Sequence, residues 1–279
     1  MNRTLVIGLT GQFREALLPG LLGRGSPVLA VSRNPQPSEP GVEWVLGSLQ
    51  SMPAIPADIA SIVSLGPLDA FAAWFDACAP GCSRVVALGS TGQADKVDSI
   101  DPAERDLAQR LRLAEAKLFE AGERRGIAVT VLRPTLLYGS GRDQTVSRLA
   151  GLGRRWGFVV LPSSATGLRQ PVHVADVADA VLRCLELDGA RTAGRSYDLP
   201  GAETLGFDEM VRRSLARHAP GCRVLRLPTP LFQAGLGVVG LLRRAPINRG
   251  LLARLERDQL ADASDARGAF GYAPRRFEP

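Results

Sequence analysis

Short apolar runs alternate with amphipathic stretches along the first half of the chain. Most of these runs are separated by helical segments, and the clearest helix covers residues 101–122. Its apolar stripe consists of Leu107, Leu111, Ala114, Leu118 and Ala121. The candidate strands are 5–8, 28–31, 42–45, 59–65, 85–88 and 128–132. This alternation predicts a doubly wound α/β fold, in which helices cover both faces of a parallel sheet.

The regular alternation ends near residue 144. We therefore expect a sheet domain over residues 1–165 and a smaller mixed α/β region over residues 166–279, which covers the substrate and partly returns to the sheet. The apolar stretch Leu231–Leu242 is shorter than the roughly 20 residues that a membrane-spanning helix needs. Its glycines favour close packing in a core over contact with a membrane.

A glycine turn joins the first strand to the first helix. Gly8 allows the chain to leave the strand sharply, and Gly11 lets backbone N–H groups approach a phosphate at the start of the helix. Arg14 stands where a third glycine is usual, so the fingerprint is weakened, and an ordinary strand-to-helix turn is the alternative. The candidate dinucleotide-binding residues in this turn are Gly8, Thr10, Gly11, Gln12 and Phe13.

The end of the second strand indicates which dinucleotide is bound. An acidic residue there would accept hydrogen bonds from a ribose 2′-hydroxyl, whereas Ser32 and Arg33 offer donors to a 2′-phosphate. We therefore expect NADP(H) to be favoured over NAD(H). The alternative is that Arg33 simply opens a proline-rich surface loop.

Composition narrows the range of partners. The chain has 279 residues and a net charge of +6, but its arginines are scattered and no nucleic-acid-binding module is recognisable. The charge suits an anionic small molecule, and we expect neither a nucleic-acid nor a membrane partner. The four cysteines have no zinc spacing, so reduced thiols and no metal are expected. Because the first strand follows Met1 almost directly, no signal peptide is expected, and a cytoplasmic location follows.

Four later motifs extend the picture to the whole chain. They are Val85-Val-Ala-Leu-Gly-Ser-Thr91, Leu132-Arg-Pro-Thr-Leu-Leu-Tyr-Gly139, Arg169-Gln-Pro-Val-His-Val-Ala-Asp176 and the segment 262–274. Together with the glycine turn they resemble the extended short-chain dehydrogenases, the NAD-dependent epimerase/dehydratase family. The resemblance implies a Rossmann-like fold and hydride chemistry on a carbonyl, an alcohol or a nucleotide sugar.

The resemblance also assigns roles to single residues. Ser90 and Thr91 match the hydroxyl residues that hydrogen-bond the reacting oxygen, although such residues also satisfy backbone groups at strand ends. Arg169 matches an arginine that faces the substrate diphosphate. Tyr138, taken as a substrate residue, is expected to pack beside the nicotinamide pocket, and a replacement catalytic hydroxyl is the alternative. The further cofactor contacts that it implies are Leu65, Gly66, Lys117 and Pro134.

The family's catalytic pair is incomplete in this sequence. Family members carry a Tyr that moves a proton and, four residues later, a Lys that holds the nicotinamide ribose. The matching residues here are Leu113 and Lys117, and leucine cannot move a proton. Two hypotheses stay open: an atypical oxidoreductase or epimerase-like enzyme, and a non-catalytic dinucleotide-binding protein with a regulatory or assembly role. Lys117 as acid/base and a homodimer through the helix 101–122 are further alternatives.

Overall fold

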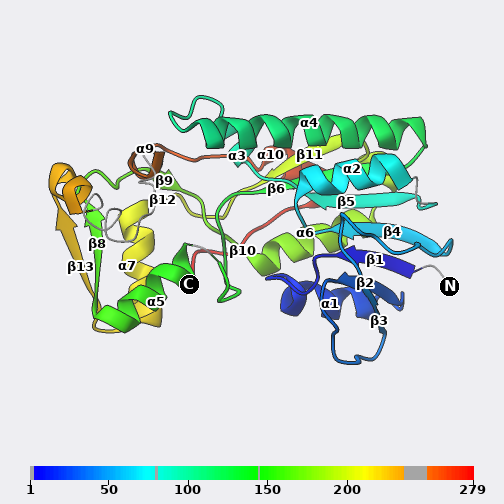
Figure 1. The fold of residues 1–279 in the computed structure, drawn as a ribbon, viewed down its shortest axis with the longest axis horizontal. Helices are drawn as coiled ribbons and strands as arrows, with labels where there is room; N and C mark the ends of the chain where they lie inside the picture. The colour runs from blue at the N-terminus through cyan, green and yellow to red at the C-terminus, as the bar shows by residue number, and fades with distance from the viewer. Residues whose placement is uncertain (1–2, 79–80, 144, 236–249) are drawn as a thin grey trace.

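The computed structural model describes residues 3–78, 81–143, 145–235 and 250–279. Its centre is a parallel seven-stranded sheet in the order β11-β6-β5-β4-β1-β2-β3 (Figure 1). The strands are β1 (Arg3–Ile7), β2 (Val28–Ser32), β3 (Val42–Leu46), β4 (Ile59–Ser64), β5 (Arg84–Leu88), β6 (Ala128–Pro134) and β11 (Arg195–Leu199). All six strands predicted from the sequence are therefore confirmed.

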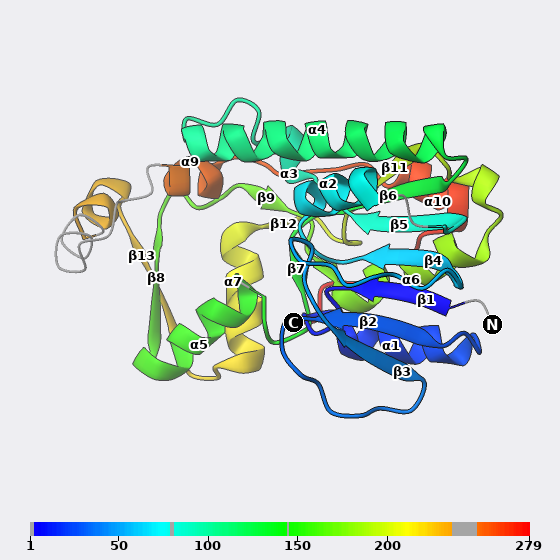
Figure 2. The same ribbon diagram turned by 45° about the vertical axis from the view of Figure 1, so that its right-hand side comes forward.

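Helices cover both faces of this sheet. One face carries α2 (Leu68–Cys78) and α4 (Pro102–Arg124), and the other carries α1 (Arg14–Gly23), α6 (Val174–Glu186) and α10 (Ser264–Phe270). In Figure 2, α4 runs along the top of the sheet, whereas α1 lies beside β2 and β3 at its lower end. Each face has its own apolar core, because the doubly buried strands send alternate side chains to opposite sides. The predicted doubly wound, Rossmann-like fold is confirmed.

Helix α4 is the longest element and carries the predicted apolar stripe. Asp101 caps its first turn by accepting a hydrogen bond of 2.9 Å from the amide of Ala103, and Pro102 occupies the first helical position, where no N–H is needed. Within the stripe Ala114, Leu118 and Ala121 are buried, and Leu107 and Leu111 are half-buried. The stripe therefore faces the sheet and α2, and the remaining positions face solvent.

A smaller region lies beyond the carboxyl edge of the sheet. It contains α5 (Val146–Trp156), β8 (Phe158–Pro162), α7 (Phe207–His218), β13 (Arg223–Leu227) and α9 (Gly250–Glu256) around a third apolar core, at the left of Figure 1. Short strands join it to the sheet: β7 (Leu137–Tyr138), β9 (Leu168–Arg169), β10 (Val172–His173) and β12 (Leu205–Gly206). The third core draws residues from both sides of the expected boundary after residue 165, so the division stays a prediction.

The chain returns to the sheet through β11, which pairs with β6 along Arg195–Leu199. Arg84, on β5, helps to hold this return, because its buried guanidinium donates to the carbonyl oxygens of Cys184 (2.5 Å) and Gly189 (3.1 Å). The turn between these elements contains η1 (Gly189–Arg191). Two distant segments, 84–88 and 184–199, are thereby fixed to each other.

Two further expectations from the sequence concern the apolar stretch 231–242 and the four cysteines. Leu231, the first residue of the stretch predicted to pack in a core, is 60% exposed, and residues 236–242 lie outside the described part of the chain. No described helix is long and apolar enough to cross a membrane. The four cysteines are free thiols, and the described side chains form no cluster of His, Cys, Asp and Glu suited to a metal.

Candidate functional site

The glycine turn has the geometry that a phosphate cradle requires. Gly8 has a φ of +88°, and a Cβ there would lie 3.2 Å from the backbone of Leu65 and Gly66, so only glycine fits without strain. The amide of Gly11 donates to the carbonyl oxygen of Gly8 at 3.1 Å. Helix α1 then begins at Arg14, and the N–H groups of its first turn have no intrahelical acceptors.

A cavity of about 560 Å³ opens in front of this turn. Five predicted cofactor contacts line it, namely Gly8, Gly11, Gln12, Phe13 and Leu65. The structure brings these together with residues that the sequence analysis missed: Leu136, Leu137, Arg142, Asp143 and Thr145. The segment 139–143 crosses to the turn, where Arg142 Nη1 donates to the carbonyl oxygen of Thr10 at 3.2 Å. Its glycine-rich sequence, Tyr138-Gly-Ser-Gly141, was the available signal.

Arg14 points away from this cavity. Its guanidinium forms an ion pair of 2.7 Å with Glu39 and lies 5.3 Å from the ring centroid of Trp44 on β3. Replacement of the usual third glycine therefore places a cation against the β3 edge and leaves the cavity open. The backbone of the glycine turn can therefore still face a phosphate, although the third glycine of the fingerprint is replaced by Arg14.

The two residues at the end of β2 differ in their surroundings. The Ser32 hydroxyl is buried and donates to the carbonyl oxygen of Asn34 at 2.7 Å, so it serves its own loop. Arg33 is exposed, and its side chain has no ion pair or hydrogen bond with any residue that the structure describes. Of the two predicted 2′-phosphate donors, Arg33 is the one left available.

The ends of β5 and β6 meet beside the same edge of the sheet. The amide of Thr91 lies 3.4 Å from the carbonyl oxygen of Pro134 and donates to it, so these two predicted residues are neighbours. Thr91 is buried and precedes the short helix α3 (Gly92–Asp95). The Ser90 hydroxyl accepts a hydrogen bond of 3.1 Å from the amide of Gly92, which is the strand-end role considered from the sequence.

Asp95 is one helical turn beyond Thr91, and its amide donates to the carbonyl oxygen of Thr91 at 3.3 Å. Burial raises the pKa of its carboxyl above the ordinary 3.8, although the charges of Arg257 and Arg169 oppose the change. The side chain is half-buried and has no hydrogen-bond partner among the described residues. Thr91 and Asp95 thus place a hydroxyl and a carboxyl of raised pKa on one short segment.

Lys117 does not lie at this edge. Its ammonium group is half-exposed and forms an ion pair of 3.1 Å with Asp76, near the end of α2. Leu113, one turn earlier, is 61% exposed. The two residues expected to match the catalytic pair therefore share the outer face of α4, and the structure does not bring Lys117 to the cavity.

A buried carboxylate occupies the opposite flank of α4. Glu115 accepts hydrogen bonds from Arg133 Nε at 3.0 Å, from Gln93 Nε2 at 3.2 Å and from the hydroxyl of Ser196. Arg133 also lies 3.6 Å from Asp198, whose pKa is raised by burial. This network joins α3, α4, β6 and β11 at the carboxyl edge of the sheet. The sequence analysis missed this network, because its other members lie 18 to 83 residues from Glu115 along the chain and come together only in the fold.

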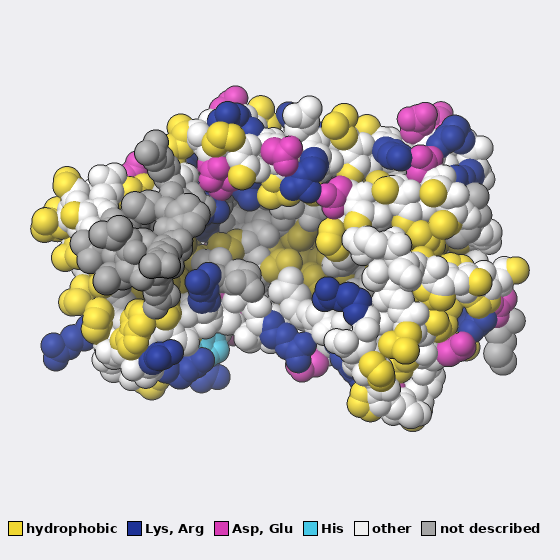
Figure 3. All heavy atoms as spheres, viewed as in Figure 1, with side chains coloured by type: hydrophobic (Ala, Val, Ile, Leu, Met, Phe, Trp, Pro, Cys, Tyr) yellow, Lys and Arg dark blue, Asp and Glu magenta, His cyan; other side chains and the backbone are white. Residues whose placement is uncertain are grey.

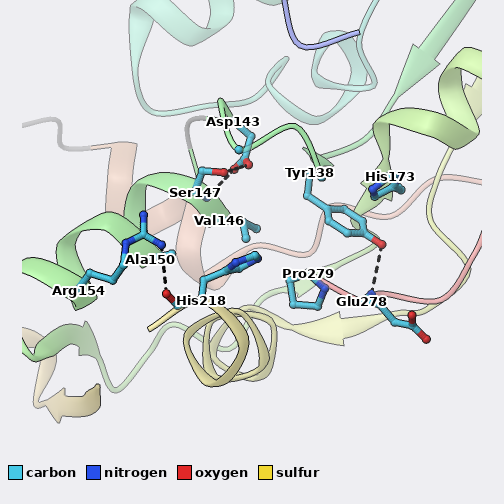
Figure 4. Close-up of a pocket in the computed structure, with 12 residues that line it drawn as sticks. Tyr138, Asp143, Val146, Ser147, Ala150, Arg154, His173, His218, Glu278 and Pro279 are labelled. Atoms are coloured by element: carbon cyan, nitrogen blue, oxygen red, sulfur yellow. Dashed lines mark hydrogen bonds between the residues drawn. The ribbon is translucent and has the colours of Figure 1, made fainter. Parts of the chain in front are cut away.

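Tyr138 belongs to a second, smaller cavity of about 200 Å³ (Figure 4). Its hydroxyl donates to the carbonyl oxygen of Arg276 at 3.1 Å and accepts from the amide of Glu278 at 3.3 Å. Burial raises the pKa of this phenol, so the side chain stays neutral. Its ring packs edge-on against Phe277 and His173. His173 caps α6 through Nδ1, which accepts from the amide of Ala175 at 3.1 Å.

Arg169 is buried and is used within the protein. Its guanidinium donates to the carbonyl oxygens of Leu168 and Arg257, both at 2.7 Å, and to that of Arg254. It also lies 5.6 Å from the ring centroid of Phe207. These contacts tie α9 to β9 and engage both terminal nitrogens of the guanidinium within the protein, so the diphosphate contact that the sequence analysis assigned to this residue stays a prediction.

Comparison with known proteins identifies the family to which this sheet and its strand-end residues belong. The family model described as "NAD dependent epimerase/dehydratase family" matches residues 46–199, which include β4, β5, α4, β6 and β11. The chain belongs to this family. The resemblance noted from the sequence motifs is confirmed, and with it a general oxidoreductase or epimerase-like role.

Members and neighbours of the family differ in the activities that their names give. The chain is 26% identical to 2-alkyl-3-oxoalkanoate reductase of Stenotrophomonas maltophilia, over 98% of this chain and 95% of the reductase. It is 30% identical to NADH dehydrogenase 1 alpha subcomplex subunit 9 of Arabidopsis thaliana mitochondria, over 38% of this chain and 26% of that subunit. The solved structure of MoeE5 with UDP-glucuronic acid and NAD shares the fold, with a TM-score of 0.71 and 20% identity over 99% of this chain and 95% of MoeE5.

The inward positions of α4 differ from the positions that carry Leu113 and Lys117. Leu107 and Leu111 are four residues apart and face inward in the two turns before Glu115, whereas Leu113 and Lys117 face outward. Leu107 and Leu111 therefore occupy inward positions of α4 with the four-residue spacing of the family's Tyr and Lys. Neither leucine can hold a ribose or move a proton.

Proposed function

We propose that the chain binds NADP(H) in the cavity in front of the glycine turn and acts as an oxidoreductase or epimerase-like protein on a carbonyl, an alcohol or a nucleotide sugar. One observation carries the proposal: the Gly8 turn and Arg33, whose side chain has no partner among the described residues, follow adjacent parallel strands, β1 and β2. A dinucleotide needs a phosphate cradle at the first strand and a contact to its adenosine ribose at the second.

The residues of the cavity fit a dinucleotide. The N–H groups at the start of α1 and the guanidinium of Arg142 supply donors and positive charge for the pyrophosphate. Arg33 supplies a planar set of donors to a 2′-phosphate. Thr91 and Pro134, at the ends of β5 and β6, bound the far end of the same edge. In this assignment Ser90 shapes the backbone of Thr91 and Gly92.

The chemistry is divided between the cofactor and the chain. When bound, the nicotinamide supplies or accepts the hydride. The Thr91 hydroxyl holds the reacting oxygen, and the Asp95 carboxyl gives a proton to that oxygen as it becomes an alcohol; water then restores the proton. Burial favours this role, because a raised pKa keeps a larger fraction of the carboxyl protonated near neutral pH. Lys117, on the outer face, takes no part.

The second candidate function is dinucleotide binding without turnover, in a regulatory or assembly role. It is favoured by Leu107 and Leu111, which fill the inward positions of α4 with side chains that have no chemistry. It also accords with the similarity to a protein named as a subunit of NADH dehydrogenase.

Calorimetric titration with NADPH and NADH in parallel tests the proposal, followed by a turnover screen with 3-oxo acids, simple ketones and UDP-sugars. Tighter binding of NADPH with turnover of any of these supports the enzyme. Binding without turnover across the screen assigns the chain to the second function. Failure to bind either dinucleotide contradicts both functions.

A further inference from the structure

The end of the smaller region at which α5 and α7 terminate carries exposed aromatic and cationic side chains. We call it the basic-aromatic end and define it by Arg154, Arg155, Trp156, Phe158, Arg217, His218, Arg223 and Leu225. These residues come from the last turns of α5 and α7 and the starts of β8 and β13. They meet there, because Arg154 Nη1 donates to the carbonyl oxygen of His218 at 3.1 Å and the amide of Arg223 donates to that of Gly157 at 2.9 Å.

Apolar side chains are unusually exposed at this end. Trp156 is 51%, Phe158 41% and Leu225 43% exposed. Phe158 and Leu225 project from the outer face of the parallel β8–β13 pair, in which Arg223 pairs with Phe158 and Leu225 with Val160. Val159 and Leu161 alternate with them and enter the third core. The outer face of the pair therefore presents apolar groups to solvent.

Arginine dominates the charge around these groups, although Arg154 and His218 also line the small cavity that contains Asp143 and Glu278. The side chains of Arg155, Arg217 and Arg223 have no ion pair or hydrogen bond with any described residue. The sequence contains no Asp or Glu over residues 144–175 or 210–255, the segments that supply this end. In Figure 3 the lower left of the molecule accordingly shows dark blue side chains beside yellow ones, without magenta.

We propose that the basic-aromatic end docks onto the surface of an anionic phospholipid membrane. Arginine beside exposed tryptophan and phenylalanine matches the two layers of such a surface, because guanidinium groups are attracted to anionic headgroups and indole rings settle at the interface below them. The aliphatic Leu225 and Val160 continue the apolar surface, which suits acyl chains better than the stacked bases of a nucleic acid.

This contact is peripheral, and it departs from the expectation of no membrane partner drawn from the sequence. That expectation rested on the scattered positions of arginine along the chain. Folding gathers several of them at one end, where α5 and α7 terminate together. We expect this contact to be independent of dinucleotide binding, since the glycine turn and Arg33 follow β1 and β2 of the central sheet, whereas the basic-aromatic end belongs to the smaller region (Figure 1).

Vesicle sedimentation tests the proposal with the full chain at about 0.1 M salt, where surface charges still act within a Debye length of about 10 Å. The probes are phosphatidylcholine vesicles and vesicles that also contain phosphatidylglycerol. We expect binding to the second kind only, weakening as salt is raised. Trp156 is a built-in reporter, because Trp74 is buried and Trp44 half-buried. Its emission is expected to shift to the blue on binding, and Trp156→Ala is expected to abolish the shift.

Two double variants with equal charge change give the matched comparison. Arg155→Glu with Arg223→Glu acts on the basic-aromatic end, and Arg105→Glu with Arg112→Glu acts on the exposed face of α4. At about fivefold in affinity for each arginine removed, the first pair is expected to weaken vesicle binding by about 25-fold or more. The second pair is expected to change it far less.

Three results would overturn the proposal. They are equal losses from the two pairs, vesicle binding without a change in Trp156 emission, and binding of a short DNA duplex in place of vesicles. Titration with NADPH and the melting temperature of each variant report on folding and on the dinucleotide site separately. Loss of NADPH binding with retained vesicle binding would contradict the proposed function and leave this inference standing.

Discussion

The guanidinium of Arg142 donates a hydrogen bond of 3.2 Å to the carbonyl oxygen of Thr10, across 132 residues of sequence. It joins the segment after β7 to the glycine turn and closes one side of the larger cavity. Because Arg14 is engaged by Glu39, Arg142 is the arginine among the residues that line this cavity. The cation at this cavity therefore comes from the loop after β7, which carries Arg142, and not from helix α1, which carries Arg14.

Arg142→Ala is expected to weaken NADPH binding about tenfold, because a phosphate contact from a charged donor contributes about 1.5 kcal/mol or more. Calorimetric titration measures the change. Arg148→Ala, on the exposed side of α5, is the control and should leave the affinity unchanged. Equal affinity of the Arg142 variant and the parent protein would remove Arg142 from the proposed site.

Arg33→Asp is expected to reverse the cofactor preference. The carboxylate would repel a 2′-phosphate and accept hydrogen bonds from a 2′-hydroxyl, so NADPH should bind at least about tenfold more weakly and NADH somewhat more tightly. Parallel titrations with the two dinucleotides provide the ratio. A ratio unchanged from that of the parent protein would show that Arg33 only opens the surface loop.

Substitutions on α4 separate its two faces. Lys117→Ala should leave NADPH affinity within about twofold of the parent, since the lysine pairs with Asp76 on the outer face. Leu107→Tyr combined with Leu111→Lys should increase the rate of carbonyl reduction, because it restores a proton donor and its cation on the inward face. Leu113→Tyr is the matched outward variant and should have no effect. A gain from Leu113→Tyr would contradict the orientation of α4.

Asp95→Asn is expected to lower turnover and to raise the melting temperature at pH 7. A folded-state pKa above the ordinary 3.8 means that folding favours the protonated carboxyl, so stability is full below that value and falls as the pH rises through the raised pKa. Asparagine removes this loss. The difference in melting temperature between the variant and the parent should narrow as the pH falls toward 3.8. A gap that stays constant with pH would argue against a buried carboxyl.

Glu115→Ala is expected to lower the free energy of unfolding by about 3–5 kcal/mol, because it leaves the Arg133 guanidinium partly buried without its carboxylate. Denaturant titration measures the loss. Glu120→Ala, on the exposed face of the same helix, should change stability by no more than about 0.5 kcal/mol. Similar losses in the two variants would mean that helix propensity, not the buried network, is responsible.

The sequence predicted the sheet and the buried stripe of α4 because both depend on local periodicity. It could not decide the flanks of that helix. At about 100° per residue, Lys117 and Glu115 lie about 80° to either side of the stripe, one toward α2 and the other toward β6. Periodicity treats these flanks alike, and only the packing against Asp76 and Arg133 distinguishes them.

The difference between local pattern and tertiary packing also explains which other site residues could be predicted. Gly8, Gly11 and Leu65 could be predicted because strand ends and glycine turns are local features that gather at one edge of a parallel sheet. Arg169 was assigned to a ligand because a motif names a residue type and not its neighbours. Its acceptors are carbonyl oxygens of residues 168, 254 and 257, and the last two, in α9 and just after it, lie 85 and 88 residues away in sequence.

The late return of β11 to the sheet has a consequence for synthesis on the ribosome. Until residue 199 has emerged, β6 is an open edge, and Arg84 lacks the carbonyl oxygens of residues 184 and 189. A nascent chain that ends near residue 165 would therefore expose an apolar strand edge of the kind that pairs with other chains. Completion of the central sheet thus waits for residues 195–199 to be translated.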